Sequence, residues 1–180
     1  MSESIANTPA TLLVSASPAP IAEAIVDTPC GALWLAANAD GLCYLRPLSR
    51  RLALVGEGVN LRHGSAQRCL QQATWQLQAY FAGELHEFSV PLAPAGTPFQ
   101  RQVWQQLLQI PYGRHSSYGE LAARLQKPGA ARAVGNANGA NPIAIMIPCH
   151  RVIGKNGTLR GYAWGEAMKR QLLALEGADA

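Results

Sequence analysis

The sequence lacks a long apolar run, a signal-peptide pattern and a high content of charge. Its 180 residues are 14% charged and 7% aromatic. No apolar run approaches the roughly 18–20 residues that a membrane span needs. Residues 1–20 have neither a basic start nor an apolar core of signal-peptide length. We therefore expect no membrane-spanning helix and no secretion signal, but a soluble protein of the cytoplasm with no membrane partner.

Cysteine is also scarce and dispersed. Cys30, Cys43, Cys69 and Cys149 form no compact pattern of the kind that builds a disulfide framework or a zinc site. In a reducing compartment all four would be free thiols. A buried free cysteine is most often ordinary packing, so each of the four starts with that interpretation.

Apolar residues and a mild positive charge are what the sequence does have. Hydrophobic residues make up 48% of the chain, which is enough to fill a core and argues against global disorder. The formal net charge is +4 and the isoelectric point is about 9.1. This charge suits a polyanionic partner such as nucleic acid without establishing one.

The first half of the chain has the pattern of a small mixed α/β unit. Residues 1–20, rich in Ala, Ser, Pro and Thr, are expected to form a flexible leader. Alternation and turn residues then predict a turn, two strands joined by a hairpin loop, a helix and a short strand. The turn covers residues 27–31, and the two strands cover 32–37 and 42–45 with the loop 38–41 between them. The helix covers 67–81 and the short strand 88–92. A Pro-rich linker over about 91–98 predicts domains over 21–92 and 93–180.

Helical spacing dominates the second half. Four helices are expected, over residues 98–110, 117–125, 130–140 and 168–176. Ser117 and Glu120 form the capping-box pattern that opens the second of them. Lys127-Pro128-Gly129 then turns the chain into the third. Helix, short turn and helix together form the outline of a helix-turn-helix.

The third of these helices has an unusual composition. Residues 129–140 are Gly or Ala at eight of twelve positions, and Arg132 is the only long side chain among them. One interpretation is a helix packed tightly against a neighbour. The other is a smooth face that approaches a DNA groove, with Arg132 protruding among phosphates or into a base stack. The pattern leaves both open, together with an ordinary surface ion pair for Arg132.

An apolar run over residues 143–147 leads directly into Pro148-Cys149-His150-Arg151-Val152. Only a few per cent of a free thiol is ionised at neutral pH, so a reactive Cys149 would need a base or a positive charge nearby. His150 is adjacent, but neighbouring side chains on an extended strand point to opposite faces. Contact between Cys149 and His150 would therefore need a turn here, or a water between the two groups.

Together with other segments, these residues resemble the signature of the methylated-DNA–protein-cysteine methyltransferases, also called O6-alkylguanine-DNA alkyltransferases. Asn141-Pro142, five apolar residues and then Pro148 to Gly154 carry the resemblance, which continues in register over about residues 97–177. The other matching segments are Thr97 to Gln100, Ile110 to Gly113, Ser117 to Ala122, Ala131 to Gly135, Gly161 to Ala163 and Leu172 to Gly177. Residues 27–92 resemble the N-terminal domain of the family more loosely.

The resemblance implies DNA repair by a single-turnover transfer of a methyl or small alkyl group to Cys149. The group would come from O6-alkylguanine in DNA, and also from O4-alkylthymine. The resemblance further implies that His150 acts as a base toward Cys149 through a water and that Glu176 stabilises the charged form of His150. Asn141 would order the turn that carries the site.

The same resemblance implies the DNA contacts. The partner would be double-stranded DNA containing O6-alkylguanine, bound through its minor groove, with Arg132 filling the gap left by the flipped base. The residues around the flipped base would be Tyr118, the main chain of Cys149, Val152 and Ala163, and Tyr162. We expect no cofactor and no obligate protein partner, but a monomer that can cluster on DNA.

The fold implied is α+β, with a small ribonuclease-H-like α/β domain followed by a mainly helical, winged-helix-like domain. The sequence departs from some relatives in two places. Asn38 and Cys43 stand at two positions where some relatives hold a structural zinc, and residues 91–99 contain no His, so no metal is expected. Trp164 stands where some relatives carry Gly, and we expect its indole to restrict large O6 substituents such as benzyl.

Three other functions fit parts of the sequence. A damage-binding protein without catalysis would look similar but would replace the acceptor cysteine, and Cys149 is intact. A transcriptional regulator could use the helix-turn-helix, but residues 1–96 fit no additional DNA-binding domain and lack a cysteine cluster that could sense methylation. A cysteine hydrolase would use Cys149 and His150, and turnover on esters or peptides would distinguish it.

Overall fold

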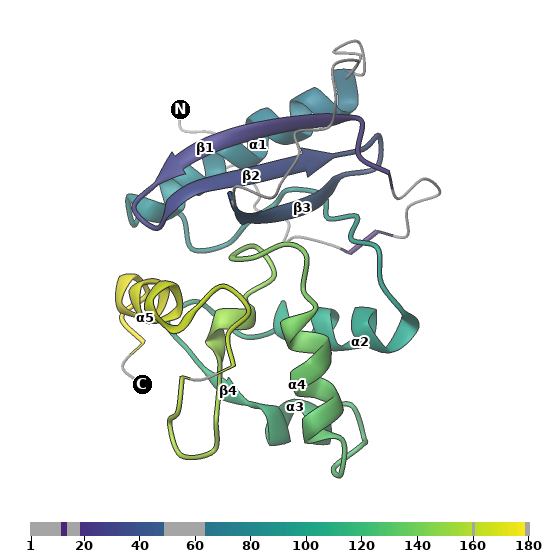
Figure 1. The fold of residues 1–180 in the computed structure, drawn as a ribbon, viewed down its shortest axis with the longest axis vertical. Coiled ribbons are helices and arrows are strands. Elements are labelled where there is room, and N and C mark those ends of the chain that lie inside the picture. The colour runs from purple at the N-terminus through teal and green to yellow at the C-terminus, as the bar shows by residue number, and fades with distance from the viewer. Residues whose placement is uncertain (1–11, 14–18, 49–63, 160, 179–180) are drawn as a thin grey trace, which may run out of the picture.

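A computed structural model of the chain describes residues 12–13, 19–48, 64–159 and 161–178 (Figure 1). A small sheet with one covering helix is followed by a mainly helical part, which confirms the predicted α+β class. The elements are β1 (Ala22–Thr28), β2 (Gly31–Ala37), β3 (Leu42–Pro47), α1 (Gly64–Phe81), α2 (Pro98–Leu107), β4 (Ser116–Ser117), α3 (Tyr118–Arg124), α4 (Ala131–Gly139), the 3-10 helix η1 (Cys149–Arg151), β5 (Val152–Ile153) and α5 (Glu166–Leu175). Over the described ranges, no helix combines the length and the apolar character needed to cross a membrane.

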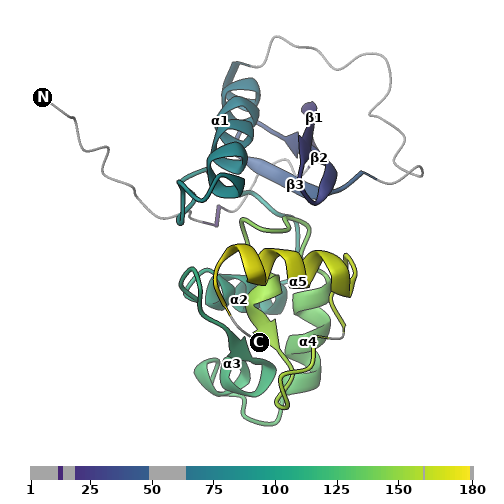
Figure 2. The same cartoon turned by 90° about the vertical axis from the view of Figure 1, so that its left-hand side faces the viewer.

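The strands β1, β2 and β3 form an antiparallel sheet in that order, and α1 packs along one face of it (Figure 2). The two predicted strands are confirmed as β2 and β3, and the loop between them is the predicted hairpin. Asn38 closes this hairpin, because its side-chain oxygen accepts from the backbone N–H groups of Asp40 and Gly41 at 2.9 and 3.0 Å.

The first strand, β1, is not predicted by the sequence pattern. Only Ala22 and Val26 of its seven residues are buried, so the strand has no clear apolar alternation. The predicted turn over 27–31 is shorter in the structure, because Thr28 pairs directly with Gly31 across a tight hairpin. Gly31 adopts a φ of +97°, which a residue without a Cβ reaches without strain.

The predicted strand over residues 88–92 is wrong. Only Leu92 forms a bridge, and its partner in the sheet is Leu42 at the start of β3. Pro91 and Pro94 flank Leu92 and have no N–H group to donate, so the ladder does not extend in either direction.

Most of the predicted leader over residues 1–20 lies outside the described residues. Where it is described, Leu13 donates its backbone N–H to the carbonyl of Leu92 at 2.7 Å. Arg101 in turn donates to the Leu13 carbonyl at 3.1 Å.

The helices of the second half follow the sequence closely. Ser117 and Glu120 form the predicted capping box, in which each side chain accepts from the other residue's backbone N–H. Thr97 and Gln100 form a second capping box, at the start of α2. The helix α2 ends at Leu107, three residues before the predicted end.

The helices α3 and α4 pack together as the predicted helix-turn-helix, and α2 packs against both of them. Trp104 of α2 is fully buried, and its indole N–H donates to the carbonyl of Ala137 in α4 at 2.9 Å. The two-residue strands β4 and β5 pair in parallel next to α3. The sequence does not predict them, since a two-residue strand is too short to show a period.

The two halves of the molecule share one continuous apolar core. The loop that follows α4 lies against β3 (Figure 1). Leu45 donates its N–H to the carbonyl of Pro142 at 3.0 Å, and Ala144 donates to the carbonyl of Leu45 at 2.7 Å. The segment that leads to Cys149 is therefore an extra partner at the edge of the sheet.

Candidate active site

The loop between α4 and η1 is closed by the side chain of Asn141, which is buried. Its amide nitrogen donates to the carbonyl of Ile147 at 2.8 Å and to the Cys149 sulfur at 3.0 Å. Its amide oxygen accepts from the N–H of Ile143 at 3.0 Å. Ile145 within the loop has a φ of +68°, which is rare for a β-branched residue and costs energy that the surrounding contacts must offset. Asn141 thus joins both ends of a strained loop to the thiol.

Cys149 and His150 lie in the turn of 3-10 helix η1, not on an extended strand. The structure therefore supplies the turn that contact between them would require, yet no hydrogen bond joins the two side chains. The His150 Nε2 lies 2.8 Å from Glu176 Oε1. The His150 Nδ1 is buried and has no hydrogen-bond partner among the described residues. This nitrogen is free to act as an acceptor.

The Cys149 thiol is buried, with 2% of the residue exposed. Burial raises the pKa of the thiol, and the hydrogen bond from Asn141 acts in the opposite direction without outweighing burial. The Tyr162 hydroxyl also lies near enough to lower this pKa, although its geometry falls short of a hydrogen bond. The resting thiol therefore keeps its proton at neutral pH and needs a base to react.

Glu176 gathers the charged groups behind Cys149. Arg151 donates to both of its oxygens, from Nε at 2.8 Å and from Nη2 at 3.0 Å. Burial raises the pKa of the Glu176 carboxyl, but the hydrogen bonds from His150 and Arg151, and their charge at the acidic pH where the carboxyl titrates, outweigh it and lower the pKa to about 2. The two hydrogen bonds from the Arg151 guanidinium keep Glu176 ionised even beside a neutral His150.

His150 is neutral in the resting site. Its side chain is fully buried, and burial lowers its pKa against the opposing effect of the hydrogen bond to Glu176. Because Glu176 is an anion, the Nε2 of a neutral His150 carries the proton and donates it to Oε1. The lone pair is then on Nδ1, the unpartnered nitrogen.

Three groups of this network are not predicted from the sequence. Arg151 lies in the motif around Cys149, but the resemblance implies no role for it. Lys169 is fully buried on the apolar side of α5 and donates to the Val152 carbonyl. A lysine at a helix position otherwise occupied by apolar residues signals a buried, paired cation and could have been found. Tyr80 on α1 donates to Glu176 Oε1 at 2.7 Å, and nothing in the sequence points to it.

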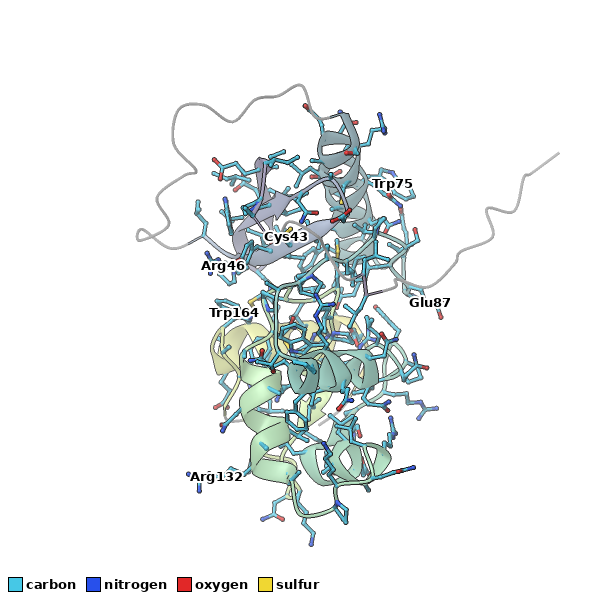
Figure 3. The ribbon with its side chains drawn as sticks, turned by 90° about the vertical axis from the view of Figure 1, so that its right-hand side faces the viewer. Cys43, Arg46, Trp75, Glu87, Arg132 and Trp164 are labelled. Carbon is cyan, nitrogen blue, oxygen red and sulfur yellow. The ribbon has the colours of Figure 1, made fainter. Side chains whose placement is uncertain are left out.

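Arg132 lies at the exposed end of α4 and points away from the molecule (Figure 3). The exposed positions of α4 and its C-cap are Arg132, Ala133, Asn136, Gly139 and Ala140, which recur at helical spacing. The buried face is formed by Val134, Ala137 and Asn138. The buried face packs against the molecule, as the first interpretation expects, and the exposed face carries small residues and Arg132. No ion pair of Arg132 occurs among the described residues.

Tyr118 is the first residue of α3 and is half-buried. Its ring lies against Gly135 of α4, where a Cβ would be 3.7 Å from the ring. Burial raises the pKa of Tyr118, and the nearby Cys149 adds to this, so the hydroxyl keeps its proton. A groove beside Tyr118 is lined by residues of β4, α3 and the turn after β5, including Ser117 and Lys155.

The remaining predicted pocket residues differ in how far they are buried. Val152 is buried, and its carbonyl already accepts from Lys169, which leaves one lone pair. Tyr162 is buried, Ala163 is exposed, and Trp164 is half-buried with an indole N–H that has no partner among the described residues.

Asn38 and Cys43, at the two positions where some relatives hold zinc, have other roles here. Asn38 closes the β2–β3 hairpin. Cys43 is buried with its sulfur 3.6 Å from the Gly41 carbonyl, and burial raises its pKa to about 11. Within the described ranges, no group of three or more His, Cys, Asp or Glu side chains is placed to hold a metal ion.

Two family models match the chain. The model of the 6-O-methylguanine DNA methyltransferase ribonuclease-like domain matches residues 21–94. The model of the 6-O-methylguanine DNA methyltransferase DNA binding domain matches residues 98–178.

Individual proteins agree with the family models. The methylated-DNA–protein-cysteine methyltransferase of Methanosarcina acetivorans is 46% identical over 155 residues, covering 86% of this chain and 97% of the relative. The protein of the same name from Mycobacterium tuberculosis is 50% identical over 155 residues, covering 86% and 92%. The crystal structure of Mycobacterium tuberculosis OGT in complex with DNA superposes with a TM-score of 0.74 at 49% identity, covering 87% of this chain and 92% of that one.

Proposed function

The chain belongs to the methylated-DNA–protein-cysteine methyltransferase family, which repairs DNA by alkyl transfer to a cysteine, and on that premise we propose that Cys149 is the alkyl acceptor. The observation that carries this proposal is the position of the thiol. Cys149 is held by Asn141 at 3.0 Å, next in the chain to a buried His150 that is paired with an ionised Glu176. No such surroundings are found around Cys30, Cys43 or Cys69. Burial is the largest effect on the pKa of each of these thiols, and it raises that pKa.

Deprotonation of the thiol is the first step of the proposed mechanism. A neutral His150 takes the proton at Nδ1 through a bridging water, and the imidazolium that forms is stabilised by Glu176. The high pKa that burial gives Cys149 means that little thiolate exists until the base acts. Asn141 donates to the sulfur and so stabilises the negative charge as it forms.

Alkyl transfer is then one displacement. The Cys149 sulfur forms a bond to the alkyl carbon, the bond from that carbon to guanine O6 breaks, and its electron pair goes to O6. Ala163 N–H and the Tyr118 hydroxyl donate to the purine as its charge develops. In the net reaction, the alkyl group moves from guanine to sulfur, and guanine gains the proton that the thiol has lost. The thioether is stable, so each molecule reacts once.

DNA binding is proposed to use α4 and the groove next to Tyr118. The small residues on the exposed face of α4 allow close approach to the minor groove, and Arg132 enters the gap left by the flipped guanine. The pocket for that base would be formed by Tyr118, the main chain of Cys149, Val152 and Ala163, and Tyr162. Double-stranded DNA containing O6-alkylguanine is the partner, and binding should weaken with salt.

The proposals on further substrates and on the cellular context rest on the same family membership. We propose action on O4-alkylthymine as well as O6-alkylguanine, no cofactor and a monomer in the cytoplasm that can cluster on DNA. Residues 21–92 and 93–180 are proposed as the two domains. Trp164 is proposed to restrict large O6 substituents, because its indole is half-buried directly after Ala163.

The first test uses the protein and a short duplex containing O6-methylguanine. Intact mass should rise by one methylene per molecule, and peptide mapping should place the added methyl on Cys149. Cys149→Ala should show no gain in mass. Cys43→Ala removes a thiol that is as buried as Cys149, and this variant should react as the unaltered protein does. A methyl on another residue, or more than one turnover per molecule, would contradict the proposal.

A further inference from the structure

Tyr80 connects the N-terminal part of the molecule to the candidate active site. It lies in the last turn of α1, is fully buried, and donates its hydroxyl to Glu176 Oε1 at 2.7 Å. Three other rings hold its side chain, since Phe81 and Phe88 have centroids 5.3 Å away and Tyr112 has its centroid 6.0 Å away. Burial raises the pKa of Tyr80, and Glu176 adds to this, so the hydroxyl is always a donor.

The donors to Glu176 are not evenly divided between its oxygens. Oε1 accepts from Tyr80 at 2.7 Å, His150 at 2.8 Å and Arg151 Nη2 at 3.0 Å. Oε2 accepts from Arg151 Nε at 2.8 Å and from the Gly113 N–H at 3.3 Å. Three donors therefore share one carboxylate oxygen, which offers about two lone-pair positions. Tyr80 and His150 compete for the same negative charge.

We propose that Tyr80 is a positioning residue of the alkyl-transfer site, which holds Glu176 Oε1 and weakens its pull on the His150 proton so that His150 remains a neutral base. This inference rests on the proposed roles of Cys149, His150 and Glu176. Without the Tyr80 hydroxyl, Oε1 would attract the imidazolium more strongly and His150 would be protonated at a higher pH.

Other charged or titratable groups surround His150 and Glu176. They come from every element packed there: Tyr80 from α1, Tyr112 from the turn after α2, Cys149 and Arg151 from η1, and Lys169 from α5. Arg151 and Lys169 lower the pKa of His150, in the same direction as burial. Tyr80 differs from them because it carries no charge and acts only through the oxygen that His150 uses.

The test is the pH dependence of single-turnover methyl transfer to Cys149. In Tyr80→Phe the ring packing is kept and only the hydroxyl is lost. We expect the acidic fall in rate to move to higher pH by about half a unit to one unit, which lowers the rate about three- to tenfold on the acidic side. On the alkaline plateau, the rate should stay within about twofold of the unaltered protein, because there His150 is neutral in both.

Tyr112→Phe is the matched control. Its hydroxyl donates to the carbonyl of Leu175 at 3.1 Å, at the same end of α5, and not to the Glu176 carboxylate. This variant should leave the acidic fall in rate where it is. Tyr80→3-fluorotyrosine keeps the ring and makes its hydroxyl a stronger donor, so it should move the fall to lower pH. In a Glu176→Gln background the shared oxygen has lost its negative charge, so Tyr80→Phe should move the fall by less than it does in the unaltered protein.

The outcomes separate this inference from the proposed function. The inference is supported if the acidic fall in rate moves to higher pH in Tyr80→Phe, moves to lower pH in Tyr80→3-fluorotyrosine, and does not move in Tyr112→Phe. An acidic fall that stays in place in Tyr80→Phe, or that moves just as far in the Glu176→Gln background, overturns it. If the unaltered protein transfers no methyl to Cys149, the proposed function itself fails. An NMR titration of the His150 ring in the unreacted protein checks the same shift without DNA.

Discussion

Truncating Asn141 to alanine tests the bonds that close the loop in front of Cys149. The change removes the donor to the Ile147 carbonyl and the acceptor for the Ile143 N–H, at 2.8 and 3.0 Å. Both isoleucines are fully buried, so water does not readily replace the lost partners. Each unsatisfied buried group costs about 1–3 kcal/mol, and with some relaxation of the loop we expect a total near 3 kcal/mol. For a protein of this size that corresponds to a fall in Tm of roughly 6–12 °C.

The thiol should respond to the same change. The Asn141 amide donates to the Cys149 sulfur and lowers its pKa, so its removal should raise that pKa further and slow methyl transfer. Urea unfolding followed by tryptophan fluorescence measures the first effect, and intact mass against time measures the second.

Asn138→Ala supplies the comparison. Asn138 is as buried as Asn141, at 2% exposure, and stands three positions earlier, but its side-chain oxygen has no partner within the described ranges. Its truncation breaks none of the bonds that close the loop. If Asn141→Ala destabilised the protein no more than Asn138→Ala does, the loop would not depend on Asn141 and the reasoning would be refuted.

Other perturbations probe Glu176, Arg132 and Trp164. The folded pKa of Glu176 is about 2, below its usual 4.5, so its stabilisation is complete above the unfolded value and is lost as pH falls toward 2. Urea unfolding between about pH 6 and pH 3 should show this loss, and Glu176→Gln should flatten it. Arg132→Ala should weaken DNA binding about tenfold and lower its salt slope by up to about one, with no effect on reaction with free O6-benzylguanine. Trp164→Gly should speed that reaction, and an equal rate would count against a restriction by the indole.

The helices were predictable because their signals are local. The Ser117 and Glu120 capping box needs only four residues, and the structure contains it as predicted. The same holds for the hairpin closed by Asn38. By contrast, β1 buries only Ala22 and Val26, so its place in the sheet depends on pairing with β2 and not on its own pattern.

The site was predictable only where a motif carries it. Cys149, His150, Asn141 and Glu176 follow from the family signature, and the structure brings all four together. Tyr80 could not be found in this way. Its contact with Glu176 spans 96 positions and depends on how α1 packs against the second half, which no local pattern records.

The hydrogen bonds between β3 and the loop after α4 have a consequence for how the protein folds during its synthesis. The ribosome releases β3 and α1 well before the loop that pairs with Leu45 and before Glu176, which meets Tyr80. N-terminal segments generally fold first during synthesis, so the sheet and its helix can be ready when Cys149 emerges. The thiol then acquires its full surroundings only after Glu176 has also left the exit tunnel. A growing chain therefore has the proposed base His150 paired with Glu176 only after synthesis has passed that residue.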